Sequence, residues 1–272
     1  MPSLTLQEAA ARLGVHYMTM YRYVRLGLIE AEKHAGTWQV SEEALEAFHH
    51  PPNPQGDSLT PWSPRLESRL VAGDVTGAWA LIEAALASGK EPAEIYVDVL
   101  APALRSIGDR WARGELDVDD EHIATAVAHR LVGRLSARFT RRGRDRGSIV
   151  AAMPPGERHG LGLTMLTDVL RGAGYHVLDL GPDTPIGSLV KAIARTDNLK
   201  AVCIGVVMQE WVPAAAEMIA AVRRAVGPEV LILVGGAAIV DSDLALSLGA
   251  DAYAADPLVA VALIEAGVAV SD

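Results

Sequence analysis

The sequence predicts a multi-domain protein of α and α/β class: an N-terminal helix-turn-helix, a four-helix bundle and a doubly wound parallel sheet of five strands. Short helical segments meet at glycines near the N-terminus, purely helical periodicity follows a proline-rich stretch, and apolar runs alternate with amphipathic segments in the second half. A chain of 272 residues is long enough for more than one domain. We expect boundaries that divide it into residues 1–50, 51–64, 65–145 and 146–272.

The first 50 residues have the pattern of a helix-turn-helix. A helix is predicted over residues 6–13 with Thr5 as its N-cap, and Gly14 ends it at a position suited to a left-handed backbone. A second helix is predicted over residues 16–26, and two short helices joined by a glycine turn are typical of the motif. A generic helical hairpin is the alternative interpretation.

A small wing is predicted after these helices, with residues 38–40 as its return strand and a helix over 41–48. A recognition helix reaches base edges and phosphates with a few polar side chains, while Met20, Tyr23 or Val24 is expected to pack inward. The expected DNA-binding residues of the second helix and the wing are Tyr17, Thr19, Tyr21, Arg22, Arg25, Lys33 and Trp38.

The region after this unit is predicted to be a linker followed by a helical bundle. Prolines make residues 51–64 a linker by composition. Apolar residues then recur at helical spacing, and three glycine-containing breaks divide residues 65–142 into about four helices. Arginines crowd the end of the bundle, where a solvated helix face is one interpretation and DNA or subunit contact is the other.

The second half of the chain is predicted to form a Rossmann-like sheet, because strands that alternate with helices favour parallel pairing. The predicted strands are residues 148–153, 176–180, 201–207, 230–234 and 252–254. The predicted helices are residues 161–172, 186–196, 213–226, 241–248 and 257–267.

Composition narrows the class of protein. The formal charge of −10 argues against wholesale coating of nucleic acid, although a local DNA-contacting face is compatible with it. Cys203 is the single cysteine and is expected to be a buried small hydrophobe, so no disulfide framework or paired-cysteine zinc site is expected. The N-terminus lacks a signal pattern and no apolar run reaches membrane-spanning length, so we expect a soluble cytoplasmic protein without a membrane partner.

A histidine loop is expected directly after the first strand of the sheet. His159 would lie where open α/β sheets bind ligands, and its imidazole is a suitable nitrogen ligand for cobalt, iron or zinc. Glu157 is expected to accept the other ring N–H, which fixes the tautomer. Gly160 and Gly162 allow close approach of a bulky group, and the pair Gly235–Gly236 would open the same side of the sheet for a long ligand tail.

A second candidate group lies in the helical region. Trp111 is followed, after nine residues, by Glu121 and His122. Bundle core is the alternative interpretation of Trp111, and Glu121 is also a favourable first-turn acid for a helix. Two imidazoles and an indole can surround one flat, metal-centred ligand.

These motifs together resemble the cobalamin-binding domain of corrinoid proteins. The similarity is carried by Glu157-x-His159-x-x-Gly162, the stretch from Gly174 to Pro185, and Gly235-Gly236. The resemblance implies that His159 is the lower axial ligand of cobalt, in place of the cofactor's own benzimidazole base. Corrinoid domains usually carry Ser-x-Leu on the third strand, where the serine contacts the displaced base. Here Gly205 stands at that place, and it is included among the expected cofactor-binding residues.

The motif of Trp111, Glu121 and His122 is similar to that of CarH/LitR-type light-sensing transcriptional regulators, and the N-terminal unit resembles MerR/excisionase-like heads. The resemblance implies that Trp111 packs over the upper axial group and that His122 becomes a second metal ligand after photolysis. We therefore expect a regulator, a repressor and not an enzyme, that uses adenosylcobalamin, with methylcobalamin or hydroxocobalamin as alternative forms.

The expected partners are operator DNA and further copies of the chain, as a homo-oligomer that is a dimer or a tetramer. The alternatives are a corrinoid protein of a methyltransferase system and a regulator of the same fold that no longer uses cobalamin. The helix-turn-helix discriminates against the first alternative, because a methyl carrier has no evident use for one.

Overall fold

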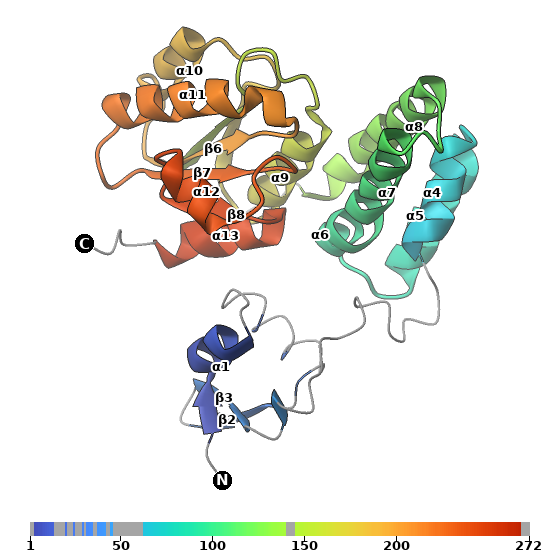
Figure 1. Cartoon of the computed structure of the whole chain (residues 1–272), viewed down its shortest axis with the longest axis horizontal. Helices are drawn as coiled ribbons and strands as arrows, with labels where there is room; N and C mark the ends of the chain where they lie inside the picture. Colours follow the sequence, from blue (N-terminus) through green and yellow to red (C-terminus); the bar gives the residue numbers. More distant parts are fainter. Residues whose placement is uncertain are drawn as a thin grey trace. The chain divides into compact units, whose positions relative to one another are not determined.

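The computed structural model describes residues 3–13, 20, 24, 29, 31–34, 37–41, 44–45, 62–139 and 145–267. They belong to two compact units, Met1–Pro61 and Trp62–Asp272, and Figure 1 colours the chain in order along the sequence. Within these ranges, no helix combines the length and the apolar character needed to cross a bilayer.

The first unit contains one described helix and a small antiparallel sheet. Its elements are β1 (Ser3–Thr5), α1 (Leu6–Leu13), β2 (Ala31–His34) and β3 (Thr37–Ser41). Thr5 begins α1 as predicted, because its Oγ1 accepts from the Glu8 N–H at 3.3 Å. The Glu8 carboxylate in turn accepts from the Thr5 N–H at 2.8 Å, which completes a capping box.

The predicted wing is confirmed as the hairpin of β2 and β3, in which Lys33 pairs with Trp38. The sequence analysis did not predict β1, which pairs with β3 and gives the strand order β1-β3-β2. Met20 and Val24 are buried with Leu6 and Val40 in the core of this unit. The expectation that apolar residues of the second helical segment face inward is therefore confirmed at these two positions.

The helical region is a bundle of four helices between residues 62 and 139, as predicted. Its segments are α4 (Trp62–Val71), α5 (Val75–Ala87), α6 (Pro92–Glu94), the π-helical turn η1 (Ile95–Leu100), α7 (Ala101–Ala112), α8 (Val118–Ser136) and the 3-10 turn η2 (Ala137–Phe139). Three of them, α6, η1 and α7, follow without a break and make the third helix. The first helix includes the last three residues of the predicted linker, because Pro64 is tolerated in a first helical turn, where its missing N–H costs nothing.

The π-helical turn η1 has a local cause in the sequence. Pro102 has no N–H, and its ring would clash with the carbonyl of Asp98 in a regular α-helix. The backbone widens instead, and the Ala101 N–H donates to the carbonyl of Tyr96, five residues earlier. Tyr96 is therefore held in a segment whose geometry differs from the rest of the bundle.

The second half of the described chain forms the predicted five-stranded parallel sheet. Its strands are β4 (Ser148–Ala152), β5 (His176–Asp179), β6 (Leu199–Gly205), β7 (Leu231–Gly235) and β8 (Ala252–Ala254). Its helices are α9 (Leu161–Gly172), α10 (Ile186–Ile193), the 3-10 turn η3 (Gln209–Trp211), α11 (Val212–Ala225), α12 (Ser242–Ser247) and α13 (Pro257–Ala266). Within residues 145–267 the strand order is β5-β4-β6-β7-β8.

Helices cover both faces of this sheet, which confirms the doubly wound arrangement. Val150 and Val202 face the apolar residues of α10 and α11, whereas the alternate residues Ile149 and Cys203 face α9 and α13. Figure 1 shows α10 and α11 on one side of the sheet and α9 and α13 on the other. Cys203 is buried as expected, and burial raises the pKa of its thiol to about 12.

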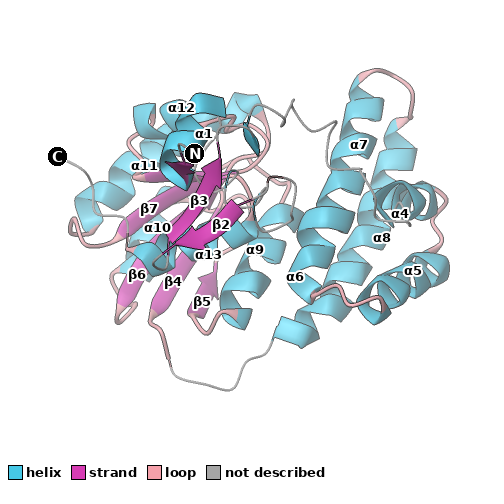
Figure 2. Ribbon diagram, turned by 90° about the horizontal axis from the view of Figure 1, so that it is seen from below, coloured by secondary structure: helices cyan, strands magenta, loops and turns pink. Residues whose placement is uncertain are grey.

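The bundle packs directly on α9. Leu161, Met165 and Val169 lie one turn apart on α9 and belong to the same apolar cluster as the bundle core. Figure 2 shows α9 between the sheet and the bundle. Fully burying such a side chain contributes about 1.5–3 kcal/mol each, so this apolar face joins the two halves of the second unit.

Candidate functional site

The histidine loop lies at the switch point of the sheet. It follows β4, and the strand order places β5 on one side of β4 and β6 on the other. Open α/β sheets bind ligands outside the carboxyl ends of the strands at such a point. The loop that carries His159 and the loop that follows β6 therefore face the place where a ligand is expected.

Glu157 connects these two loops. Its side chain is fully buried, and its Oε2 accepts hydrogen bonds from the backbone N–H groups of Val207 at 2.9 Å and Met208 at 2.8 Å. Its Oε1 lies 2.6 Å from Nδ1 of His159 and also accepts from the His159 N–H at 3.1 Å. Each carboxylate oxygen of Glu157 therefore has two hydrogen-bonding contacts.

The protonation of the pair follows from these contacts. Burial by itself raises the pKa of Glu157, but the hydrogen bonds from Met208, His159 and Val207 outweigh burial and lower the pKa below its ordinary value. Glu157 is therefore ionised near neutral pH and can only accept hydrogen bonds. Nδ1 of His159 must then carry the proton, so Nε2 of the neutral ring keeps its lone pair. The His159 side chain is 55% exposed, which leaves the ring accessible to a ligand.

A third loop, which lies in the stretch from Gly174 to Pro185, is hydrogen-bonded to the histidine loop. The Asp183 N–H donates to the carbonyl of Glu157 at 2.8 Å, and Asp183 Oδ1 accepts from the Gly156 N–H at 2.8 Å. Asp183 is an aspartate of the stretch that carries the resemblance, and it has a positive φ of 50° that favours aspartate over bulkier residues. The loops after β4, β5 and β6 therefore hold one another in place.

The glycines of the expected site have different environments. A Cβ at Gly162 would meet no atom within 4 Å, and one at Gly205 would make ordinary contact with Met153 at 3.4 Å. A Cβ at Gly160 would lie 3.2 Å from Pro182. Nothing inside the described chain therefore requires glycine at position 162, which fits the expectation of a bulky ligand there.

Gly235 and Gly236 have an internal reason to be glycine. A Cβ at Gly235 would lie 2.4 Å from the carbonyl oxygen of Ala254, and one at Gly236 would lie 2.2 Å from that of Val206. Gly236 also has a φ of +106°. Close packing of backbone segments explains this pair, and its contact with a ligand tail stays a prediction.

Trp111 and His122 lie at the end of the bundle where α7 is followed by α8. Trp111 is 45% exposed, and the His122 side chain is 73% exposed. Glu121 accepts a hydrogen bond from Thr125 Oγ1 at 2.7 Å, and its carboxylate lies 3.7 Å from Nε2 of His122. The structure therefore brings Glu121 and His122 together, and it brings Glu157 and His159 together. Contact of either pair with one ligand stays a prediction.

The charges that act on Tyr253 in β8 come from both halves of the second unit. Burial and the charges of Asp241 and Asp256 raise the pKa of Tyr253, while Arg105 of α7 acts in the opposite direction.

The expected DNA contacts lie mostly outside the described residues. This holds for Tyr17, Thr19, Tyr21, Arg22 and Arg25, and for the side chain of Lys33. Trp38 lies in β3, where it is half-buried and packs against the core of the unit. Its role toward DNA stays a prediction.

Comparison with known proteins agrees with these features. Residues 63–136 and residues 147–262 match two family models that are each described as a B12 binding domain. Residues 3–48 match a model described as a helix-turn-helix domain. The solved structure of the Methanosarcina barkeri monomethylamine corrinoid protein has a TM-score of 0.67, with 20% identity, and covers 75% of this chain and 97% of that one. The helical and α/β parts thus share the corrinoid protein fold.

Curated relatives include a transcriptional repressor and methylamine corrinoid proteins. The HTH-type transcriptional repressor CarH of Myxococcus xanthus is 36% identical over 103 residues, which are 38% of this chain and 33% of that protein. Dimethylamine corrinoid protein 2 of Methanosarcina mazei is 29% identical over 63% of this chain and 81% of its own length. Monomethylamine corrinoid protein 2 of Methanosarcina acetivorans is 23% identical over 52% of this chain and 66% of its own length.

Proposed function

We propose that this chain, which joins B12-binding domains to a helix-turn-helix domain in the manner of CarH-type regulators, is a cobalamin-dependent transcriptional regulator that responds to light. The domain combination is that of a non-enzymatic regulator, and cobalamin is the cofactor class that both B12-binding matches imply. The form with adenosyl as its upper group, and the response to light, are our own proposals.

The observation that carries the proposal is the Glu157–His159 pair. A buried carboxylate that accepts Nδ1–H leaves Nε2 as a basic nitrogen at the carboxyl edge of the sheet. Such an arrangement orients an imidazole toward a metal and increases its basicity. Nε2 of His159 would bind the cobalt of the cofactor, and Gly162 would leave room for a bulky group.

Residues of the bundle would also contact the cofactor. Trp111 offers an exposed apolar surface that can cover an adenosyl group. When bound, adenosylcobalamin supplies a cobalt–carbon bond that light breaks. His122 has an exposed imidazole that would then be available as a second nitrogen ligand. Movement of His122 would pull the start of α8 and shift the tip of the bundle.

Assembly would couple this movement to DNA. Residues 1–50 carry four lysines and arginines against six acidic residues, so one head is expected to bind DNA weakly. Several heads on one dimer or tetramer would raise affinity through effective concentration. Light changes the affinity for DNA if the cofactor states before and after light favour different packing of the subunits.

An absorption experiment tests the proposal. Purified protein is incubated with adenosylcobalamin in darkness, separated from free cofactor, and measured before and after green light. We expect bound cofactor in darkness and, after light, a new spectrum together with a changed elution volume in size-exclusion chromatography. His159→Ala should lose most of the bound cofactor. An elution volume unaffected by light, with adenosylcobalamin bound, would reject the light response.

A corrinoid protein for methyl transfer is the second candidate, and the similarity to methylamine corrinoid proteins favours it. The helix-turn-helix match distinguishes the two candidates, because only a regulator needs it. Binding of the full chain to upstream DNA in a gel shift supports the regulator, and methyl transfer to a bound cob(I)alamin without DNA binding supports the carrier. Specific DNA binding together with no uptake of any cobalamin would instead identify a regulator that has lost the cofactor.

A further inference from the structure

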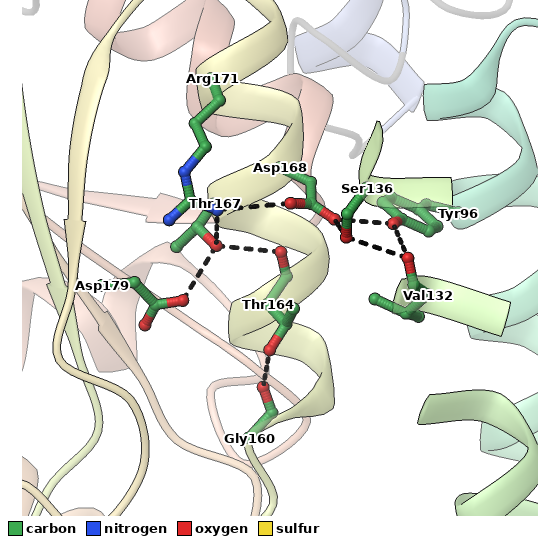
Figure 3. Close-up of polar contacts among 9 residues, drawn as sticks. All are labelled: Tyr96, Val132, Ser136, Gly160, Thr164, Thr167, Asp168, Arg171 and Asp179. Atoms are coloured by element: carbon green, nitrogen blue, oxygen red, sulfur yellow. Dashed lines mark hydrogen bonds and ion pairs between the residues drawn. The ribbon is translucent and has the colours of Figure 1, made fainter. Parts of the chain in front are cut away.

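A buried carboxylate joins the bundle to α9. Asp168 lies in the middle of α9 and is 3% exposed. Its Oδ2 accepts hydrogen bonds from the hydroxyl of Tyr96 at 2.8 Å and from the hydroxyl of Ser136 at 2.5 Å. Tyr96 comes from η1 and Ser136 from the last turn of α8, so one oxygen atom connects two bundle helices with α9, as Figure 3 shows.

The same network continues toward the sheet. Asp168 Oδ1 accepts from Arg171 Nη1 at 3.3 Å, and the same nitrogen donates to Thr167 Oγ1 at 3.2 Å. Thr167 is fully buried, and its hydroxyl lies 3.1 Å from Oδ2 of Asp179 at the carboxyl end of β5. The contacts in Figure 3 therefore extend from the bundle across α9 to the edge of the sheet.

The helix α9 also leads back to the cofactor loop. It begins at Leu161, two residues after His159, and Thr164 Oγ1 donates to the carbonyl of Gly160 at 3.2 Å. At a rise of about 1.5 Å per residue, Asp168 lies about 10 Å along the helix from its first residue. One stiff helix thus carries the cofactor loop at its start and the bundle contact in its middle.

The bundle contact is polar, although the neighbouring residues Met165 and Val169 of α9 pack on the bundle through apolar side chains. A buried carboxylate is costly without partners, and both hydroxyls donate to it. Burial and the neighbouring Asp168 raise the pKa of Tyr96 well above its ordinary value, so the hydroxyl keeps the proton that it donates. Unlike the surrounding leucine and methionine contacts, these hydrogen bonds require a narrow range of distances and angles between the helices.

The other end of the bundle lacks such a contact among the residues described. Trp111, Val118 and Ile123 are 45%, 56% and 43% exposed, respectively. One end of the bundle is therefore hydrogen-bonded to α9, while the end with the proposed cofactor residues presents exposed apolar side chains.

We propose that Asp168 is a positioning residue: it fixes the bundle on α9, so that the bundle turns about this point and its tip, with Trp111 and His122, moves relative to His159. The inference rests on the proposed function for the role of the tip. The anchor itself is a property of the chain without cofactor, and each part can be tested separately.

Hydrogen exchange of the full-length, cofactor-free chain tests the anchor. Tyr96→Phe and Ser136→Ala each remove one hydroxyl and keep the packing shape, and Tyr175→Phe is the matched control because it removes a largely buried phenol hydroxyl outside this network. We expect amide exchange in α9 and in the last turns of α8 to become about tenfold faster in both variants, with β6 unchanged. Equal exchange in the variants and the control would overturn the anchor.

The rate of the light response tests the positioning role. With adenosylcobalamin bound, the variants should keep the dark spectrum of wild type, because the Glu157–His159 pair is intact. After a light pulse, we compare the rate of the spectral change that depends on His122. This rate should differ about tenfold between Tyr96→Phe and wild type, and it should be the same in Tyr175→Phe and wild type. An unchanged rate in a variant with faster exchange would overturn the positioning role, whereas wild type that binds no cobalamin would overturn the proposed function and leave the exchange result standing.

Discussion

The carboxylate of Glu157 contacts Nδ1 of His159 at 2.6 Å through one oxygen and the N–H groups that follow β6 through the other. One buried side chain therefore orients the imidazole and joins two loops at the switch point of the sheet. The following predictions on cofactor affinity and on pH both depend on this double role.

Replacement of Glu157 by glutamine should weaken cobalamin binding about 10–100-fold. The amide of glutamine can donate to Nδ1, which would move the ring proton to Nε2 and block the metal-binding nitrogen. Titration of the protein with cobalamin, followed by absorption, measures the change. Glu217→Gln is the matched control, since Glu217 lies on the exposed face of α11 outside the proposed site, and it should leave the affinity for cobalamin unchanged. Equal affinity of Glu157→Gln and wild type would contradict the assigned tautomer.

Glu157 should also make the stability of the cofactor-free protein depend on pH. Its pKa is lower in the folded protein than the ordinary value of about 4.3, so its contribution is present above that value and is lost as the pH falls through the folded-state pKa. The unfolding free energy, measured with urea from about pH 6 to about pH 3, should fall more steeply in wild type than in Glu157→Gln. If the unfolding free energy of the two proteins fell in parallel with pH, the hydrogen bonds would not stabilise the ionised form of Glu157.

Two glycine substitutions should have opposite effects. Gly236→Ala places a Cβ 2.2 Å from a backbone oxygen at a positive φ, so it should destabilise the fold by at least about 1–3 kcal/mol. Gly162 lies in α9, and the Cβ of Gly162→Ala would have no neighbouring atom within 4 Å. Because alanine favours a helix more than glycine does, this variant should stabilise the cofactor-free protein by up to about 1 kcal/mol. Thermal unfolding measures both changes. If Gly162 faces the cofactor, the same variant should bind cobalamin more weakly, and unaltered affinity would remove Gly162 from the site.

Arg22 and Arg25 should contribute to DNA binding. Arginine contacts to phosphate contribute to affinity in a salt-dependent way. The double substitution Arg22→Ala and Arg25→Ala should abolish the shift of operator DNA in a gel and leave cobalamin binding intact. Arg12→Ala, in the first helix, is a comparison variant with the same charge change per residue. Retained operator binding in the double variant would show that another element contacts DNA.

The elements of the fold were predictable because their signals are local. Apolar periodicity indicated the helices of the bundle and the five strands of the sheet, and Thr5 as an N-cap indicated the start of α1. The strand β1 was missed, since three residues show no alternation that stands out from a loop. The π-helical turn was missed as well, although Pro102 at its end is a local cause.

The sequence alone determined which residue types stand after each strand, and so it placed His159 and Glu157 at the carboxyl edge of the sheet. Only the tertiary structure decided that the Glu157 carboxylate accepts hydrogen bonds from the amides of Val207 and Met208. It also decided that the carbonyl of Val206 leaves no room for a side chain at Gly236. The hydrogen bonds of Asp168 with Tyr96 and Ser136 likewise depend on the packing of separate helices. Each of these contacts links segments far apart in the chain. Hydrophobic periodicity and capping patterns report only on neighbours within a turn or a strand, whereas such contacts depend on where separate elements meet after packing.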